Sequence, residues 1–463
     1  MKKYLVALLS LGLVMAFSMS AFAVSADFSG QYYAVGDYQS NTRLGTDKDK
    51  AGENSNAYIQ QRLRLFTKLK IVEGLTFTTR MDALETIWGR DQAPSTTNPA
   101  LVNVDGKAFR DYNTANISFE QAWLTVATGM GTFDVGYKTG TPFTWGTKFM
   151  NAPGTAPGIR WNKDFGAFKL LADWHKTSKG NIATTGKPSL TASDADADYY
   201  DLGVSSKFKN GDAGLLMTYF RDATLRGTPA APGTLSTVVN FQPYAKMKFG
   251  PLDLEAEAYW ITGKVKLEEG ATTGQDQDVS AMGLYGNAKF NMGPAFAGVI
   301  GAYASGQDKS KTDKITGKIQ SDLGYGTDTD IWPVTTPLIL FGYHYHGTGL
   351  SQYIPTSAND PKSKFNNALL VMIYGGYAAT NKLSFDFKLV PYAKADQDGA
   401  ATGWQSKDYG REVDVKATYK IYDALTYNVG AAYLWTGDYF KGTVATAKVD
   451  NNYLITHWLD LAF

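Results

Sequence analysis

The sequence predicts an all-β protein, a transmembrane antiparallel up-and-down β-barrel of 18 strands, with 16 strands as the alternative count. Apolar and polar residues alternate along most of the chain, short turns alternate with long polar segments, and the chain ends on an apolar strand. Residues 412–421 illustrate the alternation, since apolar side chains hold the odd positions and Glu412, Asp414 and Lys416 hold even ones. A period of two indicates β-strands with one apolar and one polar face.

The amino terminus has the pattern of a secretory signal peptide at residues 1–23. Lys2 and Lys3 precede an apolar run at 4–17, and Ala21-Phe22-Ala23 follows it. A charged start, an apolar stretch and an A-x-A site are the three parts of such a peptide. The run is shorter than the roughly 20 residues that a membrane-spanning helix needs. We therefore predict cleavage after Ala23 and one barrel domain over residues 24–463.

Composition excludes several classes of protein. The formal net charge is +1, and loss of two lysines with the signal peptide leaves 1 − 2 = −1, so no basic excess for nucleic-acid binding exists. The chain has no cysteine, which rules out disulfides and thiolate metal sites. After the signal peptide no apolar run is long enough for a transmembrane helix.

The predicted strands are long. Several last about 12 to 14 residues, whereas soluble strands usually have roughly five or six and a tilted bilayer crossing needs about 9 to 11. Short turns at 73–74, 129–130 and 163–164 alternate with long polar segments such as 88–115 and 306–365. The clearest strands are 28–38, 58–71, 75–83, 252–260, 382–390, 411–422 and 451–463.

A soluble β-sandwich would also alternate, but an open sheet of 18 long strands leaves exposed edges, which closure removes. The last strand places Ile455, Leu459, Leu461 and the terminal Phe463 on one face. This ending resembles the carboxy-terminal assembly signal of bacterial outer-membrane barrels, although His457 departs from the usual apolar choice. The resemblance implies that the apolar faces contact lipid and the charged faces line the lumen. A Lys or Arg on the lipid face would cost about 2–4 kcal/mol at the midplane.

The inward positions carry the candidate pore-lining side chains. A basic cluster lies on adjacent predicted strands near residues 62–80, and an acidic cluster lies at 253–257. One interpretation is an electric field across the lumen, with weak anion preference if the basic cluster faces a constriction. The other is ordinary charge pairing between strands, and the sequence leaves both open. The predicted pore-lining residues are Arg62, Arg64, Lys68, Lys70, Arg80, Asp82, Glu120, Lys148, Asp253, Glu255, Glu257, Glu412, Asp414 and Lys416.

A barrel of 16 or 18 strands leaves an aqueous channel. The first predicted strand begins at residue 28, so we expect no plug domain ahead of the barrel. Residues 136–161 resemble the third loop of general porins, which folds inward and narrows the channel. We expect such an inward loop at about 139–157, although it has Lys148 and no carboxylate. Aromatic candidates for a sugar-binding track near it are Tyr137, Phe143, Trp145 and Trp161.

The outward faces of the early strands are unusually polar. Strands near residues 57–128 place polar side chains at outward positions, where lipid disfavours them and a protein neighbour accepts them. General porins are trimers, so the resemblance implies a homotrimer in contact with outer-membrane lipid. The outward polar residues are Gln61, Thr67, Thr79, Gln121 and Thr125.

Motifs for chemistry are weak. His344 and His346 could bind a divalent metal if they share a strand face, but incidental histidines at a loop or rim are the more common case. No G-x-S-x-G, phosphate loop or H-E-x-x-H occurs, so we predict no enzyme and no cofactor.

The chain as a whole, with its glycine-containing hairpins and its Leu461-Ala462-Phe463 ending, resembles the homotrimeric outer-membrane porins of sulfate-reducing δ-proteobacteria. The resemblance implies passive diffusion of small hydrophilic solutes and ions across the bacterial outer membrane. Two alternatives remain, a substrate-selective channel for sugars or organic anions and a barrel enzyme of the outer membrane.

Overall fold

The structure is a computed structural model that describes thirteen stretches of the chain. Residues 1–23, including the predicted signal peptide, lie outside them, as do Lys148 and Phe143. The described residues are 24–40, 55–88, 117–141, 144–147, 149, 155–178, 196–225, 227–228, 231–267, 274–317, 336–341, 365–398 and 403–463.

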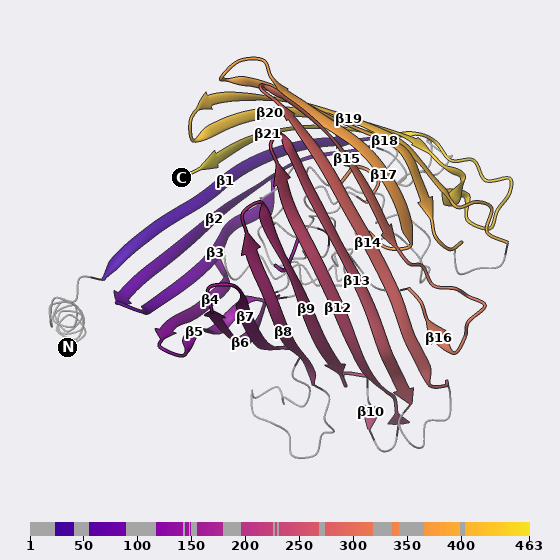
Figure 1. Cartoon of the computed structure of the whole chain (residues 1–463). Coiled ribbons are helices and arrows are strands. Elements are labelled where there is room, and N and C mark those ends of the chain that lie inside the picture. The colour runs from indigo at the N-terminus through magenta and orange to yellow at the C-terminus, as the bar shows by residue number, and fades with distance from the viewer. Residues whose placement is uncertain are drawn as a thin grey trace, which may run out of the picture.

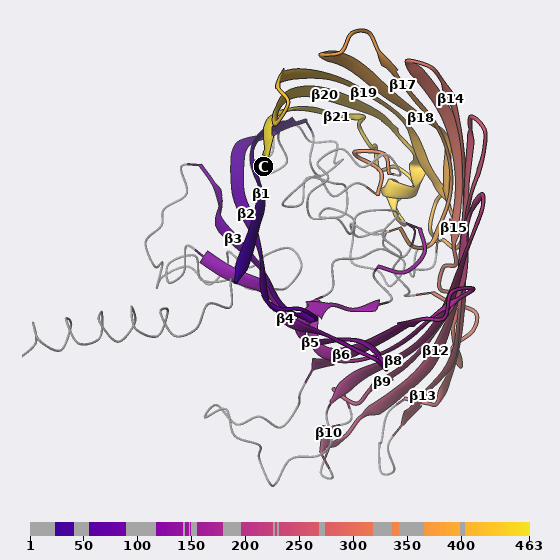
Figure 2. The same ribbon diagram turned by 60° about the vertical axis from the view of Figure 1, so that its left-hand side comes forward.

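Eighteen antiparallel strands form a closed up-and-down barrel, as the sequence predicted, so the alternative of 16 strands is wrong. Each strand pairs with the next along the chain, and β1 pairs with β21 to close the ring (Figures 1 and 2). The strands of the barrel are β1 Ser25–Gln39, β2 Asn56–Val72, β3 Leu75–Ile87, β4 Ile117–Thr128, β5 Gly131–Thr139, β6 Thr155–Asp164, β7 Lys169–Ser178, β8 Ala197–Phe208, β9 Gly211–Asp222, β12 Thr234–Phe249, β13 Leu252–Leu267, β14 Gln277–Met292, β15 Ala295–Ala304, β17 Ala368–Ala378, β18 Leu383–Ala395, β19 Asp408–Tyr422, β20 Leu425–Thr436 and β21 Asn452–Ala462.

In the described part of the chain, three short strands and one short helix lie outside the ring order. β10 (Gly227–Thr228) and β11 (Ala231–Pro232) pair only with each other, and β16 (Lys314–Ile315) adds in parallel to β14. The 3₁₀ helix η3 (Asp438–Lys441) lies between β20 and β21. Among the described residues, no helix has the length and apolar composition that crossing a membrane requires.

Short turns join the strands at one end of the barrel. Gly74 between β2 and β3 has φ +78, and Gly250 between β12 and β13 has φ +58. Side chains disfavour this left-handed region, which is why glycine occupies these turns. The turn predicted at 163–164 is shifted, because β6 continues through Asp164 and Phe165 N–H donates to Phe168 O across the following turn.

Side-chain parity agrees with the prediction on β19. Val415 is 52% exposed on the outer face, whereas Glu412 and Asp414 are buried on the inner face. On β4 the predicted parity is wrong. A register shift opposite Arg80 and Met81 inserts one residue into β4 and turns Gln121 and Thr125 inward.

The inner side of the barrel also contains an apolar core. Inward residues of β15 and β17, such as Ile300, Leu370 and Met372, are buried rather than facing water. They belong to one cluster with Phe149, Phe365 and residues 338–341, which come from segments between strands. Part of the lumen is therefore filled by apolar packing, a feature that the sequence prediction of a polar lumen did not include.

Candidate functional site: a lumen narrowed by two inward segments

The described residues between β5 and β6 are 140–141, 144–147 and 149, and their path begins at the inner face of β7. Thr141 Oγ1 donates a 2.6 Å hydrogen bond to Asp173 Oδ2. Trp145 crosses to β12, where its Nε1 donates to Gln242 O at 3.2 Å, and its ring meets Tyr244 edge-on at 5.6 Å. These contacts place the side chains of a segment between strands against the lumen wall.

The same segment continues to β13 and β14. Thr147 N–H donates to Glu257 Oε2 at 2.6 Å, and its hydroxyl donates to the same oxygen. The ring of Phe149 stacks on Tyr259 and on Tyr285, each at 5.5 Å between centroids. Buried Glu257 is thus a structural anchor for Thr147 rather than a free charge in the channel.

A second segment, residues 336–341, is held against the inner face of β19 by two of its carboxyl groups, and it belongs to the same apolar cluster as Phe149. The backbone N–H groups of Ile339 and Leu340 donate to the two oxygens of Glu412 at 2.7 and 2.6 Å. Leu338 N–H donates to Asp414 Oδ2 at 3.1 Å. Together the two side chains accept three backbone N–H groups of the segment. We refer to Glu412 and Asp414, with the three backbone donors, as the carboxylate latch.

A lysine completes the attachment. Lys388 Nζ donates to Thr336 O at 2.8 Å and lies 3.8 Å from Asp414 Oδ2. The sequence predicts Glu412 and Asp414 as an inward pair from local alternation, whereas the pairing of Lys388 with Asp414 in register comes from the structure. Their partner segment lies more than 70 residues earlier, and nothing in its sequence identifies it.

The predicted basic cluster is extensively paired. Arg64 donates from Nε and Nη2 to the two oxygens of Asp82 at 2.7 and 2.6 Å. Arg62 lies 3.9 Å from Asp82 and 3.7 Å from Glu85, and its guanidinium lies 5.0 Å from the ring centre of Tyr33. These distances fit charge pairing between neighbouring strands.

The remaining basic candidates differ in position. Arg80 lies on the inner face opposite Phe66 in register. Lys68 and Lys70 are exposed near the short-turn end of β2, away from the inward segments. Glu120 lies at the β4 register shift, where it accepts a 2.9 Å hydrogen bond from Ser118 Oγ.

The other acidic candidates and Lys416 also have neighbours. Asp253 lies 3.6 Å from Lys248, and both are partly exposed near the short-turn end. Glu255 accepts two 3.4 Å hydrogen bonds from side chains of β14. Lys416 pairs with Asp386 at 3.0 Å across β18 and β19.

One inward network was not predicted from the sequence. Asp173 on β7 accepts from Lys138 Nζ at 2.8 Å, from Thr141 Oγ1 at 2.6 Å and from two Arg160 nitrogens at 3.2 Å. His175 follows two positions later on the same inner face and is buried. The alternation in residues 169–178 would have revealed the inward Asp173 and His175, but not that β5 and β6 supply the cations.

Two of the proposed sugar-binding aromatics point away from the lumen. Tyr137 neighbours inward Lys138 on β5 and is 43% exposed on the outer face. Trp161 lies at the short-turn end, where Nε1 donates to Met130 O at 3.0 Å. Trp145 alone of the described candidates lies inside the barrel.

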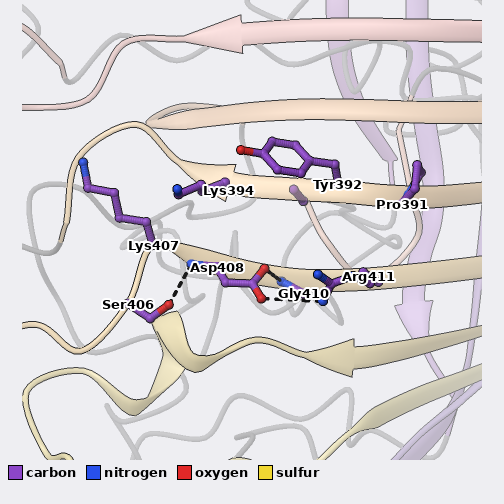
Figure 3. A pocket seen from close by; sticks show the side chains of 9 residues that line it. Pro391, Tyr392, Lys394, Ser406, Lys407, Asp408, Gly410 and Arg411 are labelled. Carbon is purple, nitrogen blue, oxygen red and sulfur yellow. Dashed lines mark hydrogen bonds and ion pairs between the residues drawn. The ribbon is translucent and has the colours of Figure 1, made fainter.

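A shallow cavity of about 320 Å³ lies where β18 and β19 approach the segment between them (Figure 3). Its lining includes Tyr392, Lys394 and Arg411, and Arg411 lies 3.6 Å from Asp408. Arg411 shares the outer face of β19 with Val415. The outward parity of Arg411 places at least this part of the cavity on the outer side of the wall.

The outward polar side chains of the early strands are partly as predicted. Gln61 lies on the outer face and accepts hydrogen bonds from Tyr32 Oη at 3.4 Å and Trp88 Nε1 at 2.9 Å. Thr67 and Thr79 face each other in register on the same face.

No protein-family model and no curated protein matches the chain. Solved structures with the same fold include OccK2 (OpdF) of Pseudomonas aeruginosa, at 9% identity and a TM-score of 0.53, covering 95% of this chain and 98% of that one. OccK9 (OpdG) of the same organism has 13% identity and a TM-score of 0.52, covering 95% and 99%. A BenF-like porin from Pseudomonas fluorescens Pf-5 has 11% identity and a TM-score of 0.51, covering 95% and 99%. These similarities show a shared barrel fold.

Proposed function

We propose that the chain is a porin of the bacterial outer membrane that lets small hydrophilic solutes and ions diffuse passively through its lumen. The observation that carries the proposal is the closed 18-stranded barrel with apolar residues outside and ionisable residues inside. Such a surface matches lipid, and barrels of this size enclose a channel. One of the structures with this fold is itself described as a porin.

Conductance in planar lipid bilayers tests the proposal. The purified chain should insert and give discrete steps, and liposomes containing it should swell in small sugars but not in large dextrans. A protein that gives no steps and no swelling, although folded by its heat-dependent gel mobility, would refute the pore. Hydrolysis of lipid or peptide by the same preparation would favour the alternative of a barrel enzyme.

A second candidate, a substrate-selective channel, is favoured by the two inward segments. Residues 144–147, 149 and 336–341 occupy lumen space and are fixed to the wall by buried carboxyl groups, so solutes meet a shaped passage. Concentration-dependent blocking of single-channel current by a sugar or an aromatic carboxylate would support selectivity. Equal permeation by solutes of one size, whatever their charge, would support general diffusion.

The proposal also includes three features that came from the sequence, a cleaved peptide at residues 1–23, an inward loop at about 139–157 and a homotrimer through strands near 57–128. Outward Gln61, Thr67 and Thr79 support the subunit interface, whereas inward Gln121 and Thr125 no longer do. Mass analysis in gentle detergent distinguishes a trimer from a monomer. An origin among sulfate-reducing δ-proteobacteria rests on the sequence resemblance alone.

A further inference from the structure

We propose that Asp173, His175 and Asp201 form a binding site for a divalent transition metal such as Zn²⁺ on the inner wall of the barrel. One ligand atom from each residue lies within 4.8 Å of the other two. Asp173 and His175 come from β7, and Asp201 comes from the neighbouring strand β8. Imidazole and carboxylate groups are the ligands that zinc takes in sites that keep a position open.

The second observation is that the site has unused ligand atoms in a fully buried place. The side chains of His175 and Asp201 are 0% exposed, yet within the part of the chain that the structure describes neither His175 ring nitrogen nor Asp201 Oδ2 has a hydrogen-bond partner. Buried polar atoms usually have partners, because leaving one unpaired costs about 1–3 kcal/mol. These orphaned atoms converge on one another, which is what a metal centre requires.

The spacing fits an ion better than a direct contact. His175 Nδ1 lies 3.6 Å from Asp201 Oδ2, too far for a hydrogen bond. Two ligand atoms on one tetrahedral zinc, each about 2.0–2.2 Å from the metal, are separated by roughly 3.3–3.6 Å. Asp173, whose ligand atom lies within 4.8 Å of the other two, would supply the third ligand.

Neighbouring residues hold the ligand side chains in a fixed orientation, as residues around a metal centre commonly do. His175 stacks on the ring of Tyr199 at 4.7 Å between centroids, which fixes the plane of the imidazole. Thr218 Oγ1 donates to Asp201 Oδ1 at 2.6 Å and leaves Oδ2 directed at the histidine. His175 Nδ1 is the nitrogen that faces Asp201 Oδ2, so we expect it to be the metal ligand. Gly140 lies on the side of Nε2, where an added Cβ would come within 2.9 Å of that nitrogen.

Two positively charged side chains beside the site should weaken metal binding, and this makes the proposal testable. Lys138 and Arg160 both donate to Asp173, at 2.8 Å and 3.2 Å, so a bound dication would share this carboxylate with them. Removing the positive charge of Lys138 should therefore strengthen binding. If the three residues form only an ion-pair network, the same substitution would loosen the structure and create no affinity for metal.

Calorimetric titration of the chelator-treated, folded full chain with ZnCl₂ in detergent tests the site. One Zn²⁺ per chain should bind, Asp201→Asn and His175→Gln should each weaken binding by at least about tenfold, and Lys138→Met should strengthen it by about tenfold or more. The matched control, His344→Gln with His346→Gln, removes two histidines elsewhere and should leave this binding unchanged. Heat-dependent gel mobility shows whether each variant is folded.

Absence of zinc binding to the folded wild-type chain would overturn the site, and so would binding that survives both Asp201→Asn and His175→Gln. Loss of binding in the His344→Gln, His346→Gln control alone would assign the metal to those histidines instead. The readout is metal affinity, so it is independent of whether the chain conducts ions.

Discussion

Replacing Glu412 with glutamine should release residues 336–341 from the wall and raise the conductance of the channel. The carboxylate of Glu412 is buried and accepts one backbone N–H on each oxygen, at 2.7 and 2.6 Å. Glutamine has the same shape but one acceptor oxygen, so one N–H of the carboxylate latch would face an NH₂ group instead.

The magnitude follows from the lost bond. The N–H that loses its acceptor is buried, and a buried donor left unpaired costs about 1–3 kcal/mol. A net change of about 2 kcal/mol shifts the equilibrium between held and released segment roughly 30-fold toward release. In single-channel recordings this should appear as a larger main conductance, or as frequent steps to a larger level.

Glu255→Gln is the matched control. It makes the same chemical change on the inner wall, but Glu255 accepts only two 3.4 Å hydrogen bonds from side chains of β14. Its recordings should match those of the wild-type chain. Identical conductance for Glu412→Gln and wild type, with both proteins folded, would show that the carboxylate latch does not hold the segment, and the reasoning would then fail.

Three other substitutions test the barrel and its lumen. Val415→Lys should lower the free energy of unfolding by about 2–4 kcal/mol because it puts a charge in lipid. Thr418→Lys on the inner face should lower it less. Similar urea midpoints for the two variants would contradict the assigned faces. Arg64→Met leaves Asp82 without its closest cation and should destabilise the barrel by about 3–5 kcal/mol in the same assay, unless Arg62 replaces it. Phe149→Ala removes the stacking on two tyrosines and should increase current noise from the segment 144–149, so a recording as quiet as the wild type would argue against a packed constriction.

Strand parity could be predicted from the sequence where lipid selects it. The alternation around Val415 and Glu412 is strict because one wrong residue would place a charge in hydrocarbon. The same reasoning failed at Gln121 and Thr125. A single extra residue at the β4 register shift reverses both, and the polar character of β4 on either face gave no sign of it.

The lumen was less predictable than the wall. Glu257 and Glu412 were identified as inward side chains, but their partners, Thr147 and the backbone of 339–340, are distant in sequence. The sequence cannot identify the residue whose backbone N–H a carboxyl group accepts, since every residue except proline has a backbone N–H. Which charges face solute and which hold a segment is therefore decided by the tertiary structure.

The seam between β1 and β21 has a consequence for assembly. Gly30 and Phe463 exchange two backbone hydrogen bonds, at 2.7 and 3.0 Å, although they come from the two ends of the chain. Every other junction of the ring joins strands that follow one another, so this one carries the greatest loop-closure entropy and should form last. Until it does, two rows of unpaired peptide groups would face hydrocarbon. A partly closed barrel is therefore not a stable state in a bilayer, and insertion and closure of the barrel should occur together in one cooperative step.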